Sequence, residues 1–213
     1  MRKILTSKWT KVVVFLVCAI PFAQLCVKAI RDGLGPNPVE TLQHTTGDWT
    51  LNFLVFTLAI TPLRKIFKLP ELIRFRRMLG LFAFFYVTTH FLTYLGPDQG
   101  FNLSGMWDDV AKRKFITVGF IALLLMIPLA ATSTAGMIRR LGGKRWQALH
   151  RLIYMCAILG VIHYYWLVKS DVRKPLIYAF WVAILLLWRA WDTYFRGKRS
   201  VPVAARPRVP AAD

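Results

Sequence analysis

Acidic residues are scarce in this chain: 10 Asp and Glu stand against 29 Lys and Arg, for a formal net charge of +19. The basic residues alternate with apolar segments, which fits membrane topology better than a duplex-binding stripe, so no nucleic-acid partner is expected. Cysteine is scarce too. Cys18, Cys26 and Cys156 all fall within apolar segments without a Cys-x-x-Cys pair, which argues against a disulfide framework or a metal or redox motif of that type.

The sequence also lacks a dinucleotide-binding motif. No G-x-G-x-x-G follows a predicted strand, and no segment is long enough to form a Rossmann domain. A nicotinamide dinucleotide is therefore not expected to bind in the usual way. Any electron donor must be lipid-soluble or a separate protein.

Long apolar runs dominate the 213 residues, of which 56% are hydrophobic. A helix needs about 20 apolar residues to cross about 30 Å of hydrocarbon. The run at residues 49–63 is too short to cross the membrane alone, so its helix is expected to begin near Pro38 or Val39, where proline is tolerated in the first turn. The six runs are residues 12–30, 49–63, 78–95, 115–134, 149–168 and 176–195.

These runs predict an all-α protein integral to the membrane, with one six-helix transmembrane domain over residues 1–195 and short up-and-down connections. The first run follows basic residues as a secretory signal does. Because it is long, contains Pro21 and lacks a clear small-x-small cleavage site, an uncleaved helix is favoured. Residues 196–213 are basic and rich in proline and alanine, which predicts a disordered cytoplasmic tail.

Basic residues mark one side of the membrane. The N-terminus, residues 64–77, residues 135–148 and the tail together carry 19 Lys and Arg. The opposite connections carry 8, together with seven of the ten acidic residues. The positive-inside rule therefore predicts a multi-pass protein with both termini in the cytoplasm.

Four histidines are candidates for chemistry: His44, His90, His150 and His163. Three of them lie within or at the ends of apolar runs, where an ionisable group is costly and a functional role is the default hypothesis. The alternative is that each histidine is neutral and only forms a hydrogen bond between helices. This alternative is less favoured, because three histidines lie on only two of the predicted helices. Haem iron can take axial imidazoles from two neighbouring helices, one on each face of the porphyrin.

Depth along the helices decides which histidines can share one iron. At about 1.5 Å per residue, His90 lies about 20 Å beyond Arg77, and His163 lies about 18 Å beyond Arg151. Both distances start at the cytoplasmic end, so these two histidines are predicted to meet at one level in the outer half. His150 lies about 20 Å nearer the cytoplasm and needs a different iron, or none.

A rotational mismatch separates His150 from His163. Their separation of 13 positions leaves about 220° on an ideal helix, so a π-bulge or an irregular first turn near residues 142–144 would be needed to align them. At the level of His150 the third helix offers Arg76 and Arg77, which are not usual haem ligands. A second haem there would be asymmetric.

Small and basic residues also suit a haem pocket. Gly80 and Gly160 would let a flat macrocycle approach a helix, although plain helix packing explains them equally well. His44 is predicted near the outer surface, where quinone binding, propionate contact and solvation all remain open. Five basic residues could pair with haem propionates, although the positive-inside rule alone accounts for most of them. They are Arg74, Arg76, Arg77, Lys144 and Arg145, and of these Arg77 is the candidate for cofactor binding.

Four segments resemble the MsrQ family of membrane subunits, also called YedZ. They are GLGPNPVETLQHTTGDW, ITPLRK, LIRFRRMLG and TSTAGMIRRLGGKRWQALHRLIY, and the resemblance covers nearly the whole chain. It implies a ferric-reductase-like transmembrane domain of the bacterial inner membrane that binds haem b, with His90, His150 and His163 as metal ligands.

The resemblance also implies an electron-transfer subunit rather than a catalytic one. Electrons would pass from membrane quinol to MsrP, a periplasmic molybdopterin enzyme that reduces methionine sulfoxide in oxidised proteins. FMN is also attributed to the family, although no motif locates it, and a soluble flavin reductase is an alternative donor. Compared with larger ferric reductases and NADPH oxidases, this chain lacks a second histidine on the third helix. One haem is therefore expected, with a second at His150 left open.

Two other functions stay open at this point. A stand-alone transmembrane ferric or quinone reductase would use the same bundle and differ only in its electron acceptor. A non-redox transporter or assembly protein would instead use buried histidines to move protons or a metal ion. Visible absorption separates the second alternative from the redox functions.

Overall fold

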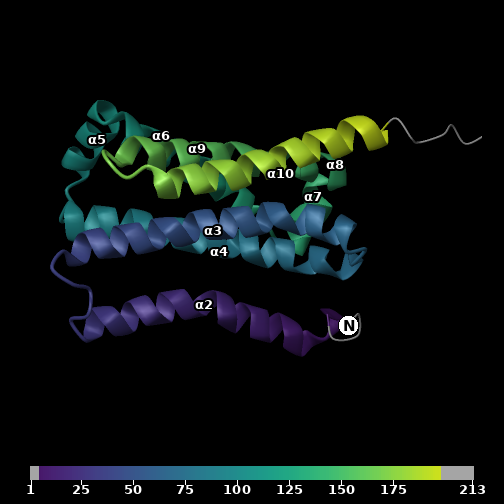
Figure 1. The fold of residues 1–213 in the computed structure, drawn as a ribbon, viewed down its shortest axis with the longest axis horizontal. Helices are drawn as coiled ribbons and strands as arrows, with labels where there is room; N and C mark the ends of the chain where they lie inside the picture. Colours follow the sequence, from purple (N-terminus) through teal and green to yellow (C-terminus); the bar gives the residue numbers. More distant parts are fainter. Residues whose placement is uncertain (1–4, 198–213) are drawn as a thin grey trace, which may run out of the picture.

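The computed structural model describes residues 5–197, and this part is helical without a β-strand. Six long helices lie where the apolar runs predict them. They run nearly parallel along the longest axis of the molecule (Figure 1). Their bounds are α2 (Lys8–Ile30), α3 (Pro38–Ile66), α4 (Ile73–Thr93), α6 (Lys114–Ala131), α9 (Leu152–Leu167) and α10 (Arg173–Gly197).

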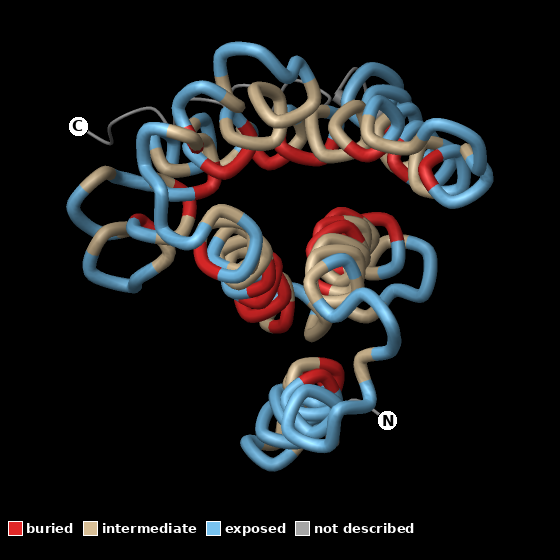
Figure 2. The backbone as a smooth tube through the Cα atoms, turned by 90° about the vertical axis from the view of Figure 1, so that its left-hand side faces the viewer, coloured by how far each residue is buried: buried red, intermediate tan, exposed pale blue. Residues whose placement is uncertain are grey.

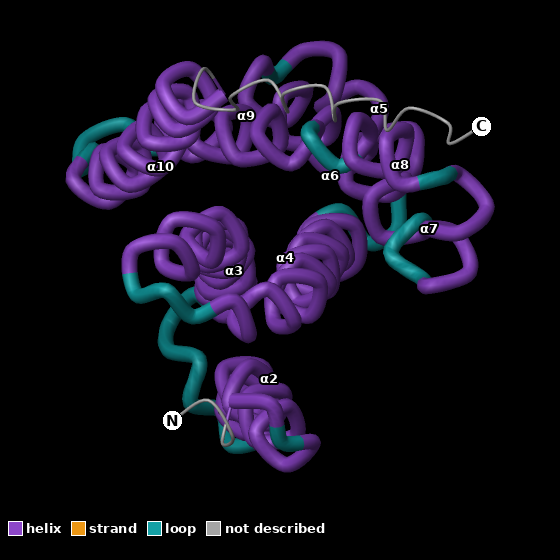
Figure 3. The backbone as a smooth tube through the Cα atoms, turned by 90° about the vertical axis from the view of Figure 1, so that its right-hand side faces the viewer, coloured by secondary structure: helices purple, strands orange, loops and turns teal. Residues whose placement is uncertain are grey.

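The long helices form layers when viewed along the bundle. Helices α6, α9 and α10 make one layer, α3 and α4 make the next, and α2 lies beyond them (Figure 3). Buried residues concentrate on the faces between the first two layers (Figure 2). The predicted tail at 196–213 lies outside the described residues, apart from its first two positions, which belong to α10.

Helix α3 begins at Pro38, as the sequence predicts. The Asn37 side chain caps it by accepting a hydrogen bond from the Glu40 amide at 3.3 Å and donating to the Glu40 carboxylate at 2.8 Å. Pro38 suits the first turn because its missing N–H would have no helical partner there. The helix continues for 29 residues to Ile66.

Five segments are long and apolar enough to cross a membrane, and α3 is not one of them. Helix α3 carries more polar residues than the others because it lies inside the bundle. Thr46, Thr50 and Thr57 are buried, and each donates its hydroxyl to a carbonyl of its own helix. The five segments are Lys8–Ile30, Pro70–Asp98, Lys114–Ala131, Gly143–Leu167 and Arg173–Phe195.

Several short helices occupy segments that the sequence pattern left as connections. A turn or helix of three to ten residues has no long apolar run, so hydropathy alone does not reveal it. Helix α5 crosses the end of the bundle where α3 begins (Figure 1). The short elements are η1 (Pro70–Leu72), the π-helical turn η2 (Tyr94–Asp98), α5 (Leu103–Lys112), α7 (Ala135–Leu141) and α8 (Gly143–Leu149).

Helix α2 is attached to the bundle through Tyr86 of α4. The Tyr86 hydroxyl accepts a hydrogen bond from the Phe22 amide at 3.0 Å and donates to the Cys18 carbonyl at 3.1 Å. In a regular helix this amide and this carbonyl would bond to each other. The hydroxyl therefore stands between two turns of α2, next to Pro21. Tyr86 is 1% exposed and stacks on Phe53 of α3.

A partly buried ion pair joins α3 to α10 near the opposite end. The Lys65 ammonium group binds the Asp192 carboxylate and also lies 5.7 Å from the ring centroid of Trp188. Asp192 is 8% exposed. An ionisable pair at this position fixes the rotation of α10 against α3, because neither charge is stable in an apolar environment alone.

The segment that leads to His150 and His163 is broken twice, and the first break lies where the sequence predicts an irregular turn. Gly142, with φ of +76°, separates α7 from α8. The break that changes the relative rotation of the two histidines lies at His150 and Arg151, between α8 and α9. Contacts with the end of α6 hold α8 there, because the Trp146 indole donates to the Thr132 carbonyl at 2.9 Å.

Candidate functional site

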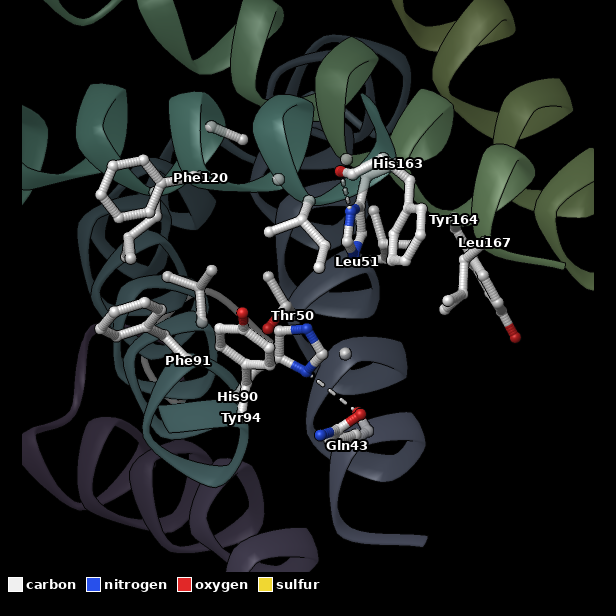
Figure 4. A pocket seen from close by; sticks show the side chains of 18 of the residues that line it. Gln43, Thr50, Leu51, His90, Phe91, Tyr94, Phe120, His163, Tyr164 and Leu167 are labelled. Carbon is white, nitrogen blue, oxygen red and sulfur yellow. Dashed lines mark hydrogen bonds between the residues drawn. The ribbon is translucent and has the colours of Figure 1, made fainter. Parts of the chain in front are cut away.

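A cavity of about 370 Å³ lies among α3, α4, α6 and α9, toward the end where α3 begins. His90 of α4 and His163 of α9 extend into it from opposite sides (Figure 4). Most of the lining is apolar, as with Leu51, Phe120 and Leu123. We call it the outer cavity, and its polar lining residues other than the two histidines are Gln43, His44, Asp48, Thr50, Tyr94, Asp98, Arg113 and Tyr164.

The rings of His90 and His163 face each other across the outer cavity. Their centroids are 6.1 Å apart and their planes cross at 82°. The predicted meeting of these two histidines at one level is thus confirmed. It follows from the lengths of two helices that start at the same membrane face, since each residue adds about 1.5 Å.

Each ring is held by a backbone carbonyl of a neighbouring helix. His90 Nδ1 lies 3.0 Å from the Gln43 carbonyl oxygen, and His163 Nδ1 lies 2.7 Å from the Phe115 carbonyl oxygen. A carbonyl only accepts hydrogen bonds, so Nδ1 carries the proton in both rings. Nε2 then keeps its lone pair, which is the arrangement that metal-binding histidines use.

The spacing of the two rings suits one metal ion between them. A metal–imidazole bond of about 2 Å, with each centroid about 1 Å behind its nitrogen, puts the centroids roughly 6 Å apart. Within residues 5–197 no group of three or more His, Cys, Asp or Glu could hold a metal ion. Two histidines alone suit a metal whose other ligands come from a macrocycle, as in haem.

A second cavity of about 520 Å³ lies toward the other end of the bundle, and we call it the inner cavity. His150 lines it, and its described lining residues include no Asp or Glu. Met126 lines both cavities and is 3% exposed, so it lies between them. The basic residues of the inner cavity are Arg64, Arg76, Arg77, Arg151 and Arg189.

His150 differs from the other two histidines in its surroundings. Its Nε2 lies 3.1 Å from the Thr132 hydroxyl, and its ring stacks on Trp146 with 3.9 Å between centroids. The sequence placed His150 level with Arg76 and Arg77, and these three residues do line one cavity. His150 is thus separate from the facing pair.

Some of the remaining predicted site residues line one of the two cavities, and others line neither. Gly160 lines the outer cavity and Gly80 the inner one. Arg74 instead donates to the Leu5 carbonyl at 2.8 Å. His44 lines the outer cavity with its side chain 41% exposed, and its Nε2 lies 3.6 Å from the Glu40 carboxylate. Lys144 and Arg145 are exposed on α8 and line neither cavity.

Sequence reasoning missed the groups behind the facing rings. Gly47 and Gly119 lie directly against His90 and His163. The carbonyls that hold the rings belong to Gln43 and Phe115. Any residue type has a carbonyl, so the only sequence signal was a glycine inside an apolar helix, where it costs about 1 kcal/mol relative to alanine.

Comparison with known proteins identifies the class of membrane protein to which this helical bundle belongs. Residues 46–161 match the family described as ferric reductase like transmembrane component. Together with the apolar helices, the match defines a multi-pass membrane protein with a ferric-reductase-like transmembrane domain. No solved structure matches the chain.

Curated relatives narrow the class to one family. A protein-methionine-sulfoxide reductase heme-binding subunit MsrQ from Herminiimonas arsenicoxydans is 52% identical, covering 89% of this chain and 88% of its own. The MsrQ subunit of Polaromonas naphthalenivorans is 48% identical, covering 92% of both chains. That of Ralstonia nicotianae is 50% identical, covering 95% and 94%. The chain belongs to the MsrQ family.

Proposed function

We propose that the chain binds haem b in the outer cavity, where His90 and His163 would hold its iron. The observation that carries this proposal is the facing pair of rings, 6.1 Å apart, each with Nδ1 on a carbonyl and Nε2 toward the cavity. The names of the relatives, which call them heme-binding subunits, support it. When bound, haem supplies a one-electron carrier inside the membrane.

The surrounding residues would bind and orient that group. Leu51, Phe120 and Leu123 offer apolar contact to a flat ring system and exclude water from it. Arg113 lines the same cavity and is held by the Asp109 carboxylate at 3.0 Å, while Tyr94 donates to that carboxylate at 3.0 Å. This cluster would close the polar end of the cavity.

We further propose that His150 and the inner cavity form the electron entry site. His150 is either the ligand of a second, asymmetric haem or a residue of the donor site. The five arginines would stabilise an anion there, whether a propionate or a deprotonated quinol. Arg77 belongs to this inner group rather than to the outer cavity. We also propose FMN as a cofactor, on the family resemblance alone.

The proposed direction is from membrane quinol, or from a soluble flavin reductase, through the haem to the periplasmic reductase MsrP. Oxidation of one quinol releases two electrons and two protons. Reduction of one methionine sulfoxide consumes two electrons and two protons and gives methionine and water, so the two reactions balance. In this arrangement all six long helices span the bacterial inner membrane, α3 included, with both termini in the cytoplasm and the outer cavity near the periplasm.

The test uses the purified full chain in proteoliposomes with a reduced quinone. Quinol-driven loss of methionine sulfoxide is expected only when the periplasmic reductase is added outside. Equal loss without that enzyme would show that the partner is not required. Rapid reduction of the purified chain by NADPH alone would contradict the proposed entry of electrons, because the sequence has no nicotinamide-binding motif.

A further inference from the structure

The two facing histidines each bond to a backbone carbonyl of a neighbouring helix, and His90 Nδ1 also lies 3.3 Å from the Thr46 hydroxyl. His90 bonds to the carbonyl of Gln43, and Gly47 follows four residues later. His163 bonds to the carbonyl of Phe115, and Gly119 follows four residues later. We call each carbonyl with the glycine four positions on a glycine seat.

The spacing of four has a geometric reason. In an α-helix the carbonyl of residue i accepts the N–H of residue i+4, so the side chain at i+4 begins beside that carbonyl. A ring from another helix can therefore reach the carbonyl only by passing over the Cα of residue i+4. Glycine leaves that path open because it has no Cβ.

The contacts at the two glycines are closer than a side chain would allow. A Cβ at Gly119 would lie 2.6 Å from His163 Nδ1 and 2.9 Å from its Cε1. A Cβ at Gly47 would lie 3.3 Å from His90 Cε1 and 3.4 Å from its Nδ1. Any side chain at position 119 must displace the imidazole, whereas position 47 requires a shift of only a few tenths of an ångström.

We propose that Gly47 and Gly119 are positioning residues for the two haem-ligating histidines. Each seat keeps the proton on Nδ1, directs Nε2 into the outer cavity and fixes the plane of the ring. The two seats together hold the ring planes at 82°. The inference rests on the proposed binding of haem by His90 and His163.

The crossing angle gives the inference a spectroscopic readout. Two axial imidazoles with nearly perpendicular planes act equally on the two iron d orbitals of π symmetry. These orbitals then stay close in energy, and the ferric low-spin electron paramagnetic resonance signal is strongly anisotropic. Rotating one ring separates the orbitals, lowers the largest g value and changes the reduction potential. A residue that only supported folding would change neither property in the haem that remains bound.

The test compares Gly119→Ala and Gly47→Ala with Gly136→Ala as the control. All three exchange a helical glycine for alanine, which favours the helix itself. Gly136 in α7 lines neither cavity, and a Cβ there meets only the Thr134 hydroxyl at 4.0 Å. Each full-length variant is purified with its haem, and its haem content, resonance spectrum and midpoint potential are measured.

A graded result is expected. Gly119→Ala should lose the bis-imidazole low-spin signal in most of its haem, because the displaced ring cannot keep both the carbonyl and the iron. Gly47→Ala should keep low-spin haem with a lower largest g value and a shifted potential. Gly136→Ala should match the unmodified chain.

Several results would overturn the inference. Unchanged spectra and potential in Gly119→Ala would show that the ring does not rest on that glycine. If Gly119→Ala aggregates on size exclusion, Gly47→Ala decides, and unchanged spectra there would equally refute the seats. An equal change in Gly136→Ala would indicate a general effect of helical glycines. Absence of bis-imidazole haem in the unmodified chain would instead refute the proposed function on which the inference rests.

Discussion

Replacing Tyr86 by phenylalanine tests how α2 is attached to the bundle. The change removes one hydroxyl and keeps the ring that stacks on Phe53. Two hydrogen bonds are lost, to the Phe22 amide and the Cys18 carbonyl. At about 0.5–1.5 kcal/mol each, the loss amounts to about 1–3 kcal/mol. Tyr86 is 1% exposed, so water does not reach the freed groups.

The two freed groups can recover part of this energy by bonding to each other, as in a regular helix. Pro21 limits that recovery, because its ring restricts how far α2 can straighten. We therefore expect Tyr86→Phe to lower the free energy of unfolding by about 2 kcal/mol, or roughly 30-fold in the equilibrium constant. Titration with a denaturing detergent, followed by tryptophan fluorescence, measures this change.

Tyr165→Phe is the matched control. Tyr165 is 47% exposed, and among residues 5–197 its hydroxyl makes no hydrogen bond. The control should stay within about 0.5 kcal/mol of the unmodified chain. If Tyr86→Phe also stays within that range, the hydroxyl does not join α2 to α4 and the reasoning is wrong.

Two further predictions concern the inner end of the bundle. His150→Ala should keep the haem of the outer cavity but slow its reduction by quinol in rapid-mixing experiments, and unchanged haem content with unchanged reduction would leave His150 a structural role only. Lys65→Met removes the ammonium group that binds the Asp192 carboxylate, so it should lower the free energy of unfolding by about 2 kcal/mol. This is less than the cost of breaking a fully buried pair, because Lys65 is 29% exposed. Adding Asp192→Asn should recover part of that loss, and strict additivity of the two changes would argue against the ion pair.

The helices and the pairing of His90 with His163 could be predicted from the sequence for simple reasons. Apolar length sets where spans begin and end, and rise per residue sets the depth of a side chain. The break at His150 and Arg151 could not be predicted, because it depends on the contact of Trp146 with the end of α6.

The glycine seats escaped the sequence analysis for a related reason. The sequence suggests Gly80 and Gly160 as points of close approach, whereas the tightest contacts with a histidine are at Gly47 and Gly119. Which glycine faces a ring depends on how two helices are rotated about their axes. Side-chain packing across the whole interface sets that rotation. The rotation therefore cannot be predicted from a single sequence.

The central claim is that His90 and His163 hold one haem between them. The most direct measurement is a reduced-minus-oxidised absorption spectrum of the purified chain, with haem quantified per chain, for the unmodified protein and for His90→Ala and His163→Ala. We predict b-type bands with at least about one haem per chain, and loss of that bis-imidazole haem in each variant, because each removes one of the two histidines that would hold the same iron. A folded but colourless protein made with ample haem, or a normal bis-imidazole spectrum in either variant, would contradict it.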